Sequence, residues 1–418
     1  MISSVILTAF ISLHYSWTYI SCSDGYAKEI ENQNRNNNKN KIGDIIKETK
    51  GKHTWAIFEI TIEIKKNDFP RLKEDFIKKG LKIFMSQSYC IKDDNLYKGT
   101  IGEEGPKAYM LINKEEAENI AISIKKNENT KKKNETNFKE GKGIPKNNEN
   151  VKIPFYILVE DISTYNIDAN SHNADKTKNH FETLDNYCNS KGFTYSIKIF
   201  AADTSDVTDI SFIFSNCKAL TKIAGLENWN IKNVTDMGCM FFGCKKLTEI
   251  KGINKWKTGN VTNMRYMFYG CEALENIDLS DWNTGNVTGM CYMFDGCKAL
   301  TNIKCLKWNT KNVTVMMGMF NFCNKLTEIK GIDKWNTINV TDMNSMFCGC
   351  NSLQNIDLSN WNTGNVANMS YMFSGCENLT EIKGIEKWKI GNGTSMIHMF
   401  KDCNNLKNIP SKFNKGLL

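Results

Sequence analysis

One spacing recurs eight times in the second half of the chain, from about Asp206 to Cys403. Each copy has Phe seven residues after a key residue and Cys three residues after that Phe, and from the second copy onward Trp stands five residues before the key residue. The key residues are Val207, Val234, Val261, Val287, Val313, Val340, Val366 and Gly393. Units of 26 or 27 residues that repeat so strictly predict a solenoid, because each unit then buries its apolar face on its neighbours.

Within a unit, the apolar residues follow two different periods. The first set is spaced by three to four residues and, in the third unit, comprises Val261, Met264, Met267, Phe268 and Cys271. This spacing predicts a short helical or 3₁₀ segment. The next run, Leu274 to Leu279, predicts a strand, and residues 281–286 supply a turn. The expected fold is an α/β solenoid of eight rungs, with one short strand and one short helical segment in each and rungs about 4.8 Å apart.

Eight cysteines share one position of the repeat. They are Cys217, Cys244, Cys271, Cys297, Cys323, Cys350, Cys376 and Cys403. Such a column could be a disulfide ladder, a metal ladder or a stack of buried thiols. Neighbouring thiols in a stack project in parallel, which is a poor geometry for a disulfide, and a buried Cys packs as a small apolar group. We therefore expect structural thiols and predict no metal site.

Three other repeated residue types have both a functional and a structural interpretation. An outward Trp column would suit sugars and the Met pairs would suit soft metals, but their regular spacing favours packing for both. Asn-x-Thr triplets, formally glycosylation acceptors, begin at Asn233, Asn260, Asn286, Asn312, Asn339 and Asn392. We expect these Asn and Thr residues to cap the short helical segment and close the turn, since Asn365 keeps the position without the triplet.

The chain begins with an apolar run. Residues 1–22 contain no Asp, Glu, Lys or Arg, which predicts a signal peptide or lipoprotein signal; an uncleaved membrane anchor is the alternative. Tyr19-Ile20-Ser21-Cys22 resembles a lipoprotein cleavage box, so Cys22 is the candidate lipidation site. Residues 23–50 are polar and rich in Asn and Lys, which predicts a disordered tether.

Residues 51–200 are expected to form a small α+β domain with a low-complexity insertion at 125–150. Apolar patterning predicts strands at 54–64, 153–159 and 193–200 and helices at 69–84 and 180–190. The region has no metal-ligand spacing, no nucleophile signature and no Gly-rich phosphate loop. We therefore predict no catalytic residue and no cofactor.

The net charge of +8 is weak evidence for a nucleic-acid partner. Residues 201–418 hold 23 Lys and Arg against 19 Asp and Glu, a net of +4, and the insertion at 125–150 holds eight Lys against four Glu, another +4. Nucleic-acid-binding domains concentrate their basic residues on one face. Here the excess is spread thinly or lies in a linker, so no nucleic acid is predicted among the partners.

The repeat resembles a known family. The pattern Asn-Val-Thr-x-Met-x-x-Met-Phe-x-x-Cys-x-x-Leu-x-x-Ile, followed by Leu-Ser-x-Trp-Asn-Thr, closely resembles the 26-residue surface-protein repeat, which is allied to BspA-like leucine-rich repeats; residues 286–303 and 339–356 match clearly. The resemblance covers about residues 200–410. It implies a right-handed, leucine-rich-repeat-like solenoid over 201–418 on an exported or surface-attached protein, often used in adhesion or host contact. It brings no catalytic residues.

The first and last units depart from this pattern. Ile210 and Ile213 replace the two Met residues of the first unit, and Gly393 replaces Val in the last. Terminal units are expected to be atypical because they cap the stack.

The candidate binding residues follow from this resemblance. In leucine-rich-repeat-like solenoids, the side chains that flank the inward Ile of each strand point outward. Here they are Glu249, Lys251, Asn276, Asp278, Asn302, Lys304, Glu328, Lys330, Asn355, Asp357, Glu381 and Lys383. These two polar columns would suit a protein or glycan on another cell or surface, or they could simply be solvated.

Two further interpretations stay open. The repeats could form a structural or shielding rod without a specific ligand, or they could target an unidentified enzyme in the N-terminal half. Membrane association is expected only through an N-terminal anchor.

Overall fold

The computed structural model describes residues 55–65, 68, 99–100, 107–111, 150–160, 181–407 and 409–416. They belong to two compact units, a sheet of strands β1–β5 and a repeat unit that includes helix α5. The signal region with Cys22, the tether at 23–50, the helix expected at 69–84 and the low-complexity residues 125–149 lie outside the described residues.

The first unit is an antiparallel sheet with the strand order β2-β3-β4-β1-β5. Its strands are β1 (Trp55–Lys65), β2 (Gly99–Thr100), β3 (Lys107–Leu111), β4 (Asn150–Glu160) and β5 (Thr194–Asp203). In β1, alternate residues from Ala56 to Ile64 are buried and Glu59 and Glu63 are half-buried, as the sequence pattern predicts. The strands expected at 54–64, 153–159 and 193–200 are therefore present with slightly shifted ends.

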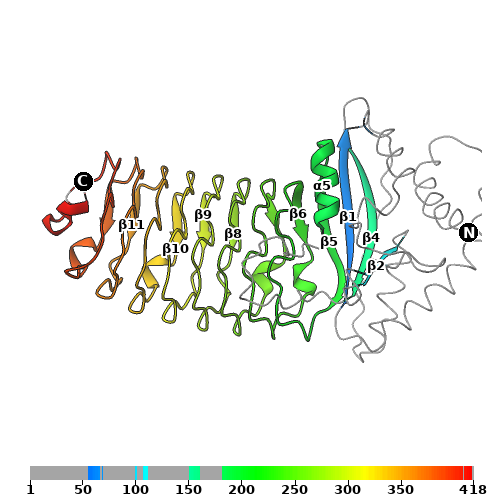
Figure 1. Ribbon diagram of the computed structural model, residues 1–418, viewed down its shortest axis with the longest axis horizontal. Coiled ribbons are helices and arrows are strands. Elements are labelled where there is room, and N and C mark those ends of the chain that lie inside the picture. The colour runs from blue at the N-terminus through cyan, green and yellow to red at the C-terminus, as the bar shows by residue number, and fades with distance from the viewer. Residues whose placement is uncertain are drawn as a thin grey trace, which may run out of the picture. The chain divides into compact units, whose positions relative to one another are not determined.

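The second unit is a β-solenoid whose coils follow one another along one axis (Figure 1). Seven coils each contribute one short strand to parallel sheets, which pair as β6-β7, β8-β9-β10 and β11-β12. The strands are β6 (Leu220–Ala224), β7 (Glu249–Ile250), β8 (Asn276–Asp278), β9 (Asn302–Lys304), β10 (Glu328–Lys330), β11 (Asn355–Asp357) and β12 (Glu381–Lys383). Within the described residues, the eighth coil contributes no strand.

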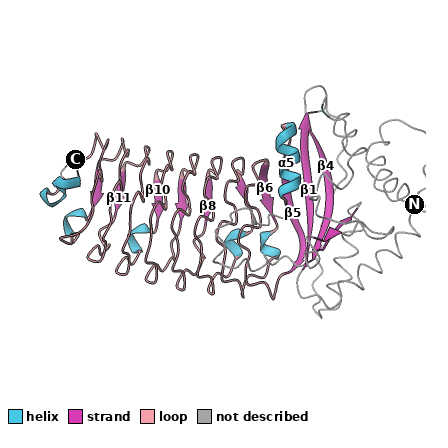
Figure 2. Ribbon diagram, viewed as in Figure 1, coloured by secondary structure: helices cyan, strands magenta, loops and turns pink. Residues whose placement is uncertain are grey.

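The segment between the key residue and the Cys is not helical, so the short helical segment expected there is a wrong prediction. These turn segments are 211–216, 238–243, 265–270, 291–296, 317–322, 344–349, 370–375 and 397–402, and they are loops in Figure 2. Alternate backbone N–H groups point to the next coil: Met237 N donates to Asn263 O at 3.0 Å and Cys239 N to Arg265 O at 2.9 Å. Each turn segment is thus part of a second parallel hydrogen-bonded ladder.

Residues with a left-handed backbone explain why the apolar residues of this ladder have the spacing of a helix in the sequence. In the third unit, Tyr266 has φ 56° and Gly270 has φ 68°. These reversals turn the chain so that residues three or four apart face inward, the same spacing that a helix produces. The sequence pattern is therefore ambiguous between the two structures.

The one-residue difference between units also has a structural cause. The longer units carry a 3₁₀ helix between strand and Trp: η4 (Leu226–Asn228), η5 (Ile253–Lys255), η6 (Ile332–Lys334) and η7 (Ile385–Lys387). A left-handed Gly precedes each of them, such as Gly331 with φ 98°. A Cβ on Gly331 would lie 2.9 Å from Cys305 O, so this turn requires glycine.

Two aromatic stacks fill the core. Rings of the repeated Phe follow one another from Phe214 to Phe400 with centroids 5.3–5.9 Å apart. The repeated Trp side chains are at most 4% exposed. Trp256 Nε1 donates to Leu226 O at 2.7 Å, and Trp282 and Trp308 make the equivalent bond. The Trp column is therefore part of the core and offers no outward strip for sugars.

The cysteine column is a stack of thiols. Cys244 Sγ donates to Phe214 O of the preceding coil at 3.0 Å, and the same bond recurs in every later coil up to Cys403 and Phe373. No disulfide joins any of the described cysteines. Burial raises the pKa of the Cys271 thiol well above its usual range, so these groups remain protonated donors that join one coil to the next.

The repeated Asn and Thr residues also join coils, and do not cap helices as expected. Asn260 Nδ2 donates to Lys232 O at 2.7 Å and Asn286 Nδ2 to Gly259 O at 2.7 Å. Asn365, which lacks the glycosylation triplet, makes the same bond to Ile338 O. The position therefore retains Asn for a bond between coils.

Both ends of the solenoid are covered. At the first coil, α5 (Glu182–Lys191) places the Asp185 carboxylate so that it accepts bonds from Lys218 N at 2.9 Å and Ala219 N at 2.7 Å, and the Phe181 ring stacks on Phe214 at 5.4 Å. At the last coil, the 3₁₀ helix η8 (Ser411–Gly416) packs the Phe413 ring edgewise on Phe400 at 5.9 Å. Backbone donors that the ladder leaves open at its start thus find a carboxylate acceptor.

Candidate binding surface

The solenoid strands place the candidate residues in two outward columns. The Ile at the centre of each strand from β8 to β12 is at most 6% exposed, and the residues beside it face away from the core. Of the twelve predicted residues, Glu249, Asn302 and Asp357 are half-buried and the other nine are exposed. The structure thus brings all twelve to one side of the solenoid, which we call the strand face.

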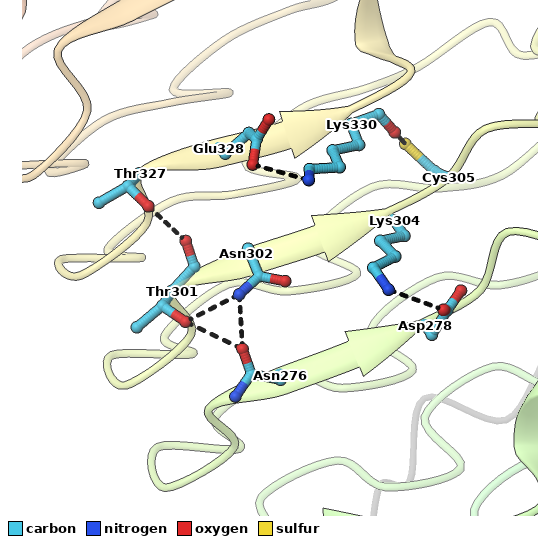
Figure 3. A network of polar contacts seen from close by, with 9 residues as sticks. All are labelled: Asn276, Asp278, Thr301, Asn302, Lys304, Cys305, Thr327, Glu328 and Lys330. Atoms are coloured by element: carbon cyan, nitrogen blue, oxygen red, sulfur yellow. Dashed lines mark hydrogen bonds and ion pairs between the residues drawn. The ribbon is translucent and has the colours of Figure 1, made fainter.

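An amide and hydroxyl network crosses the middle of the strand face (Figure 3). Asn302 Nδ2 donates to Asn276 Oδ1 at 2.6 Å, and Thr301 Oγ1 donates to the same oxygen at 3.0 Å. Asn355 accepts a comparable bond from Thr380 Oγ1 at 2.9 Å. The Asn side chains of the first column are therefore held in place by the neighbouring coil.

The four lysines of the second column each pair with a carboxylate on the same face. Lys304 Nζ lies 3.3 Å from Asp278 of the preceding coil and Lys383 Nζ lies 2.6 Å from Asp357. The other two pair within their own strands, Lys251 with Glu249 at 2.9 Å and Lys330 with Glu328 at 3.4 Å. The hydrogen bond from Lys383 lowers the pKa of Asp357 to about 2, and that from Lys251 lowers the pKa of Glu249.

These pairs are weak individually, because all four lysine side chains are between 46% and 66% exposed. Exposed ion pairs contribute only about 0–1 kcal/mol each. Their main effect is to lower the electrostatic potential of the surface, since each lysine charge has a carboxylate charge beside it. The strand face is thus polar, ordered and close to neutral.

Sequence reasoning missed two groups of surface residues. Glu272 bridges Lys245 of the preceding coil at 3.1 Å and Lys298 of the next coil at 2.9 Å. The second group is the outward aromatic side chains of the turn segments, among them Tyr266 and Tyr292. An alignment of the units draws attention to the positions that all units share, whereas these aromatic residues occupy positions that vary between units. Aromatic residues at variable positions were therefore the signal in the sequence that could have indicated this surface.

The described part of the chain shows no cluster of three or more His, Cys, Asp or Glu residues that could hold a metal ion. It also contains no helix that combines the length and the apolar character needed to cross a bilayer.

Comparison with known proteins gives one family and two distant solved structures. The model of the family described as "Mycoplasma protein of unknown function, DUF285" matches residues 208–330 and 322–416. A leucine-rich repeat protein from Bacteroides ovatus ATCC 8483 shares 17% identity, over 48% of this chain and 69% of that one, with a TM-score of 0.16. A leucine rich cell surface protein from Faecalibacterium prausnitzii A2-165 shares 14% identity, over 52% of this chain and 92% of that one, with a TM-score of 0.13. No curated protein matches.

Proposed function

Because the chain belongs to the family described as Mycoplasma protein of unknown function, DUF285, we propose that it is an exported or surface-attached repeat protein that binds a protein or glycan on another cell or surface. The apolar run at residues 1–22 supports export. The observation that carries the binding proposal is the strand face, where twelve outward side chains stand on or beside parallel strands that pair as β6-β7, β8-β9-β10 and β11-β12.

Preorganisation makes this face suitable for recognition. Asn276 and Asn355 accept bonds from the next coil, and Asn302 donates to Asn276 of the preceding coil, so a partner that binds these side chains loses little side-chain entropy. The lysine–carboxylate pairs are exposed and weak, so a partner can exchange them for its own polar groups at little cost.

The charge of the face narrows the partner class. A polyanion would meet lysines whose charges are already matched by Glu249, Asp278, Glu328 and Asp357. A neutral glycan or a protein surface of mixed charge fits better, and its affinity should depend only weakly on ionic strength.

The first test replaces Lys251, Lys304, Lys330 and Lys383 together by Ser in the full chain. We expect the labelled variant to bind intact target cells saturably, with an affinity at least tenfold weaker than that of the labelled parent chain. The matched control replaces Lys255, Lys311, Lys334 and Lys387 by Ser, which removes the same charge from exposed positions outside the two columns. Both variants should keep the circular dichroism spectrum of the parent.

Two results would contradict this proposal. Equal loss of binding in both variants would assign the effect to net charge and not to the strand face. Absence of saturable binding by the parent chain would favour the alternative of a shielding rod without a specific ligand.

A further inference from the structure

The outward residues of the turn segments form a second surface, which we call the turn face. Towards the first coil, this face carries an aromatic cluster from three successive coils. Phe242 and Tyr269 stack at 4.7 Å, Tyr266 and Tyr292 stack at 5.0 Å, and Tyr266 meets Tyr269 at 5.9 Å. All four side chains are only half-buried, so the cluster is open to a partner.

Apolar exposure continues along the turn face towards the last coil. Phe322 is 51% exposed, Tyr371 39% and Ile397 57%, and these are three of the five large apolar side chains that are exposed in the described residues. From the turn segment at 238–243 to that at 397–402 there are six steps between coils, about 29 Å at the spacing of a parallel ladder. A patch of this length and of about the same width would cover roughly 800 Å², the area that a protein partner typically buries on each side.

The backbone that carries the aromatic side chains is held in place by the ladder. Tyr266, Tyr292 and Tyr371 have left-handed backbones with φ of 56°, 56° and 58°. Their N–H groups donate to the next coil, at 3.0 Å to Cys291 O, 2.9 Å to Met317 O and 2.9 Å to Ile397 O respectively. Tyrosines fixed in this way give a large contact area at a low entropic cost, which is the property that antibody paratopes use.

The charge of the turn face is opposite to that of the whole chain. Among the residues that are half-buried or exposed, the turn segments and the isolated bridges beside them contain four acids, Asp209, Asp236, Asp342 and Asp402, and two bases, Arg265 and Lys401. The sum is −2, whereas the whole chain carries +8. Carboxylates beside aromatic rings favour cationic groups through ion pairing and cation–π contacts.

We propose that the turn face is a second docking surface, whose partner is a protein that presents Lys or Arg among apolar side chains. The rings supply the apolar contact and the cation–π contact, and the aspartates supply complementary charge. The surface is separate from the strand columns, so this inference does not depend on the proposed function of the strand face.

The test uses a variant that the repeat itself shows to be tolerated. The triple variant Tyr266→Ser, Tyr269→Ser and Tyr292→Ser places at each position a side chain that the chain carries in other coils: Ser345 is equivalent to Tyr266 and Tyr292, and Ser374 is equivalent to Tyr269. Its circular dichroism spectrum and melting temperature should therefore stay close to those of the parent.

The probe is a displayed library of random 12-residue peptides, selected on the full-length parent chain. We expect the selected peptides to be rich in Lys or Arg and in apolar residues. Synthetic copies should bind the triple variant at least tenfold more weakly, should bind the strand-face Lys→Ser variant like the parent, and should lose affinity as salt rises.

Three outcomes would overturn the proposal. They are failure to select any peptide, equal affinity of the selected peptides for the parent and the triple variant, and selected peptides without basic residues. A neutral oligosaccharide, cellohexaose, serves as the competing probe. Tyr-dependent binding of cellohexaose without peptide binding would identify a glycan site and so contradict a protein partner.

Discussion

Each coil has a strand side, which includes its β-strand, and a turn side, which includes its turn segment. The spacing between coils is the same on both sides, but the outward residues of the two sides are used differently. On the strand side, outward residues such as Asn276 and Asn302 bond to one another across coils. On the turn side, equivalent outward positions range from Gly318 to Tyr292, while the inward Phe and Cys recur in every coil. The inward Phe and Cys of each turn segment thus stabilise the coil, and the outward positions of the same segment can vary and carry recognition residues.

The largest expected effect tests whether the turn side carries more of the stability. Phe294 is fully buried between Phe268 and Phe320, and Phe294→Ala should lower the free energy of unfolding by about 3–5 kcal/mol through the cavity that it leaves. The strand-side comparison is the same kind of truncation, Ile303→Ala, expected to cost less, within the range of about 2–5 kcal/mol that is usual for this change. Urea titrations followed by Trp fluorescence measure both. Equal losses would contradict the comparison.

The second prediction concerns a buried carboxyl group in one of the turn segments, Asp295. Burial raises the pKa of Asp295 from 3.8 to about 6, although the bond from Asn321 Nδ2 opposes the shift. Between those values the native state binds more protons than the unfolded state, so this group makes the fold less stable as pH rises. The full effect is at most about 3 kcal/mol.

Asp295→Asn tests this sign directly. The variant should gain stability relative to the parent as the pH rises from 4 to 7, because an amide cannot ionise. The free energy of unfolding of both proteins, measured at several pH values, gives the difference. A pH-independent difference would show that Asp295 titrates normally in the folded protein.

The smallest effect concerns the strand side of the longer units. Gly331→Ala should cost about 1–2 kcal/mol, since its left-handed backbone disfavours a Cβ and Cys305 O must move away. The control is Gly259→Ala, where the nearest atom would lie 3.4 Å from the new Cβ and φ is not left-handed; this change should be nearly neutral. Thermal denaturation distinguishes them, and equal melting temperatures would exclude a special role for Gly331.

The sequence predicted the features that depend on buried periodicity. Strands centred on Ile277 or Ile303, the buried Cys column and the buried Trp column all follow from which side chains must avoid water. The turn segments were predicted wrongly as helical because left-handed residues such as Tyr266 create the spacing of a helix without its hydrogen bonds.

The two caps and the polar networks depend on contacts between distant residues. A helix was expected at 180–190 and is present at 182–191, but the bond from Ala219 N to Asp185 spans 34 residues and leaves no pattern in the sequence. The ion pairs of Lys304 and Lys383 likewise required the relative placement of successive coils. The sequence could predict that the candidate columns point outward, but it could not predict that their lysines pair with carboxylates on the same face.

The two end caps have a consequence for how such a molecule can change its length. Helix α5 closes the first coil and Phe413 closes the last, while the coils between them present the same upper and lower edges to each other. Whole coils can therefore be inserted or deleted in the interior without exposing a new edge. A protein of this design can thus change its length by whole coils while both end caps stay the same.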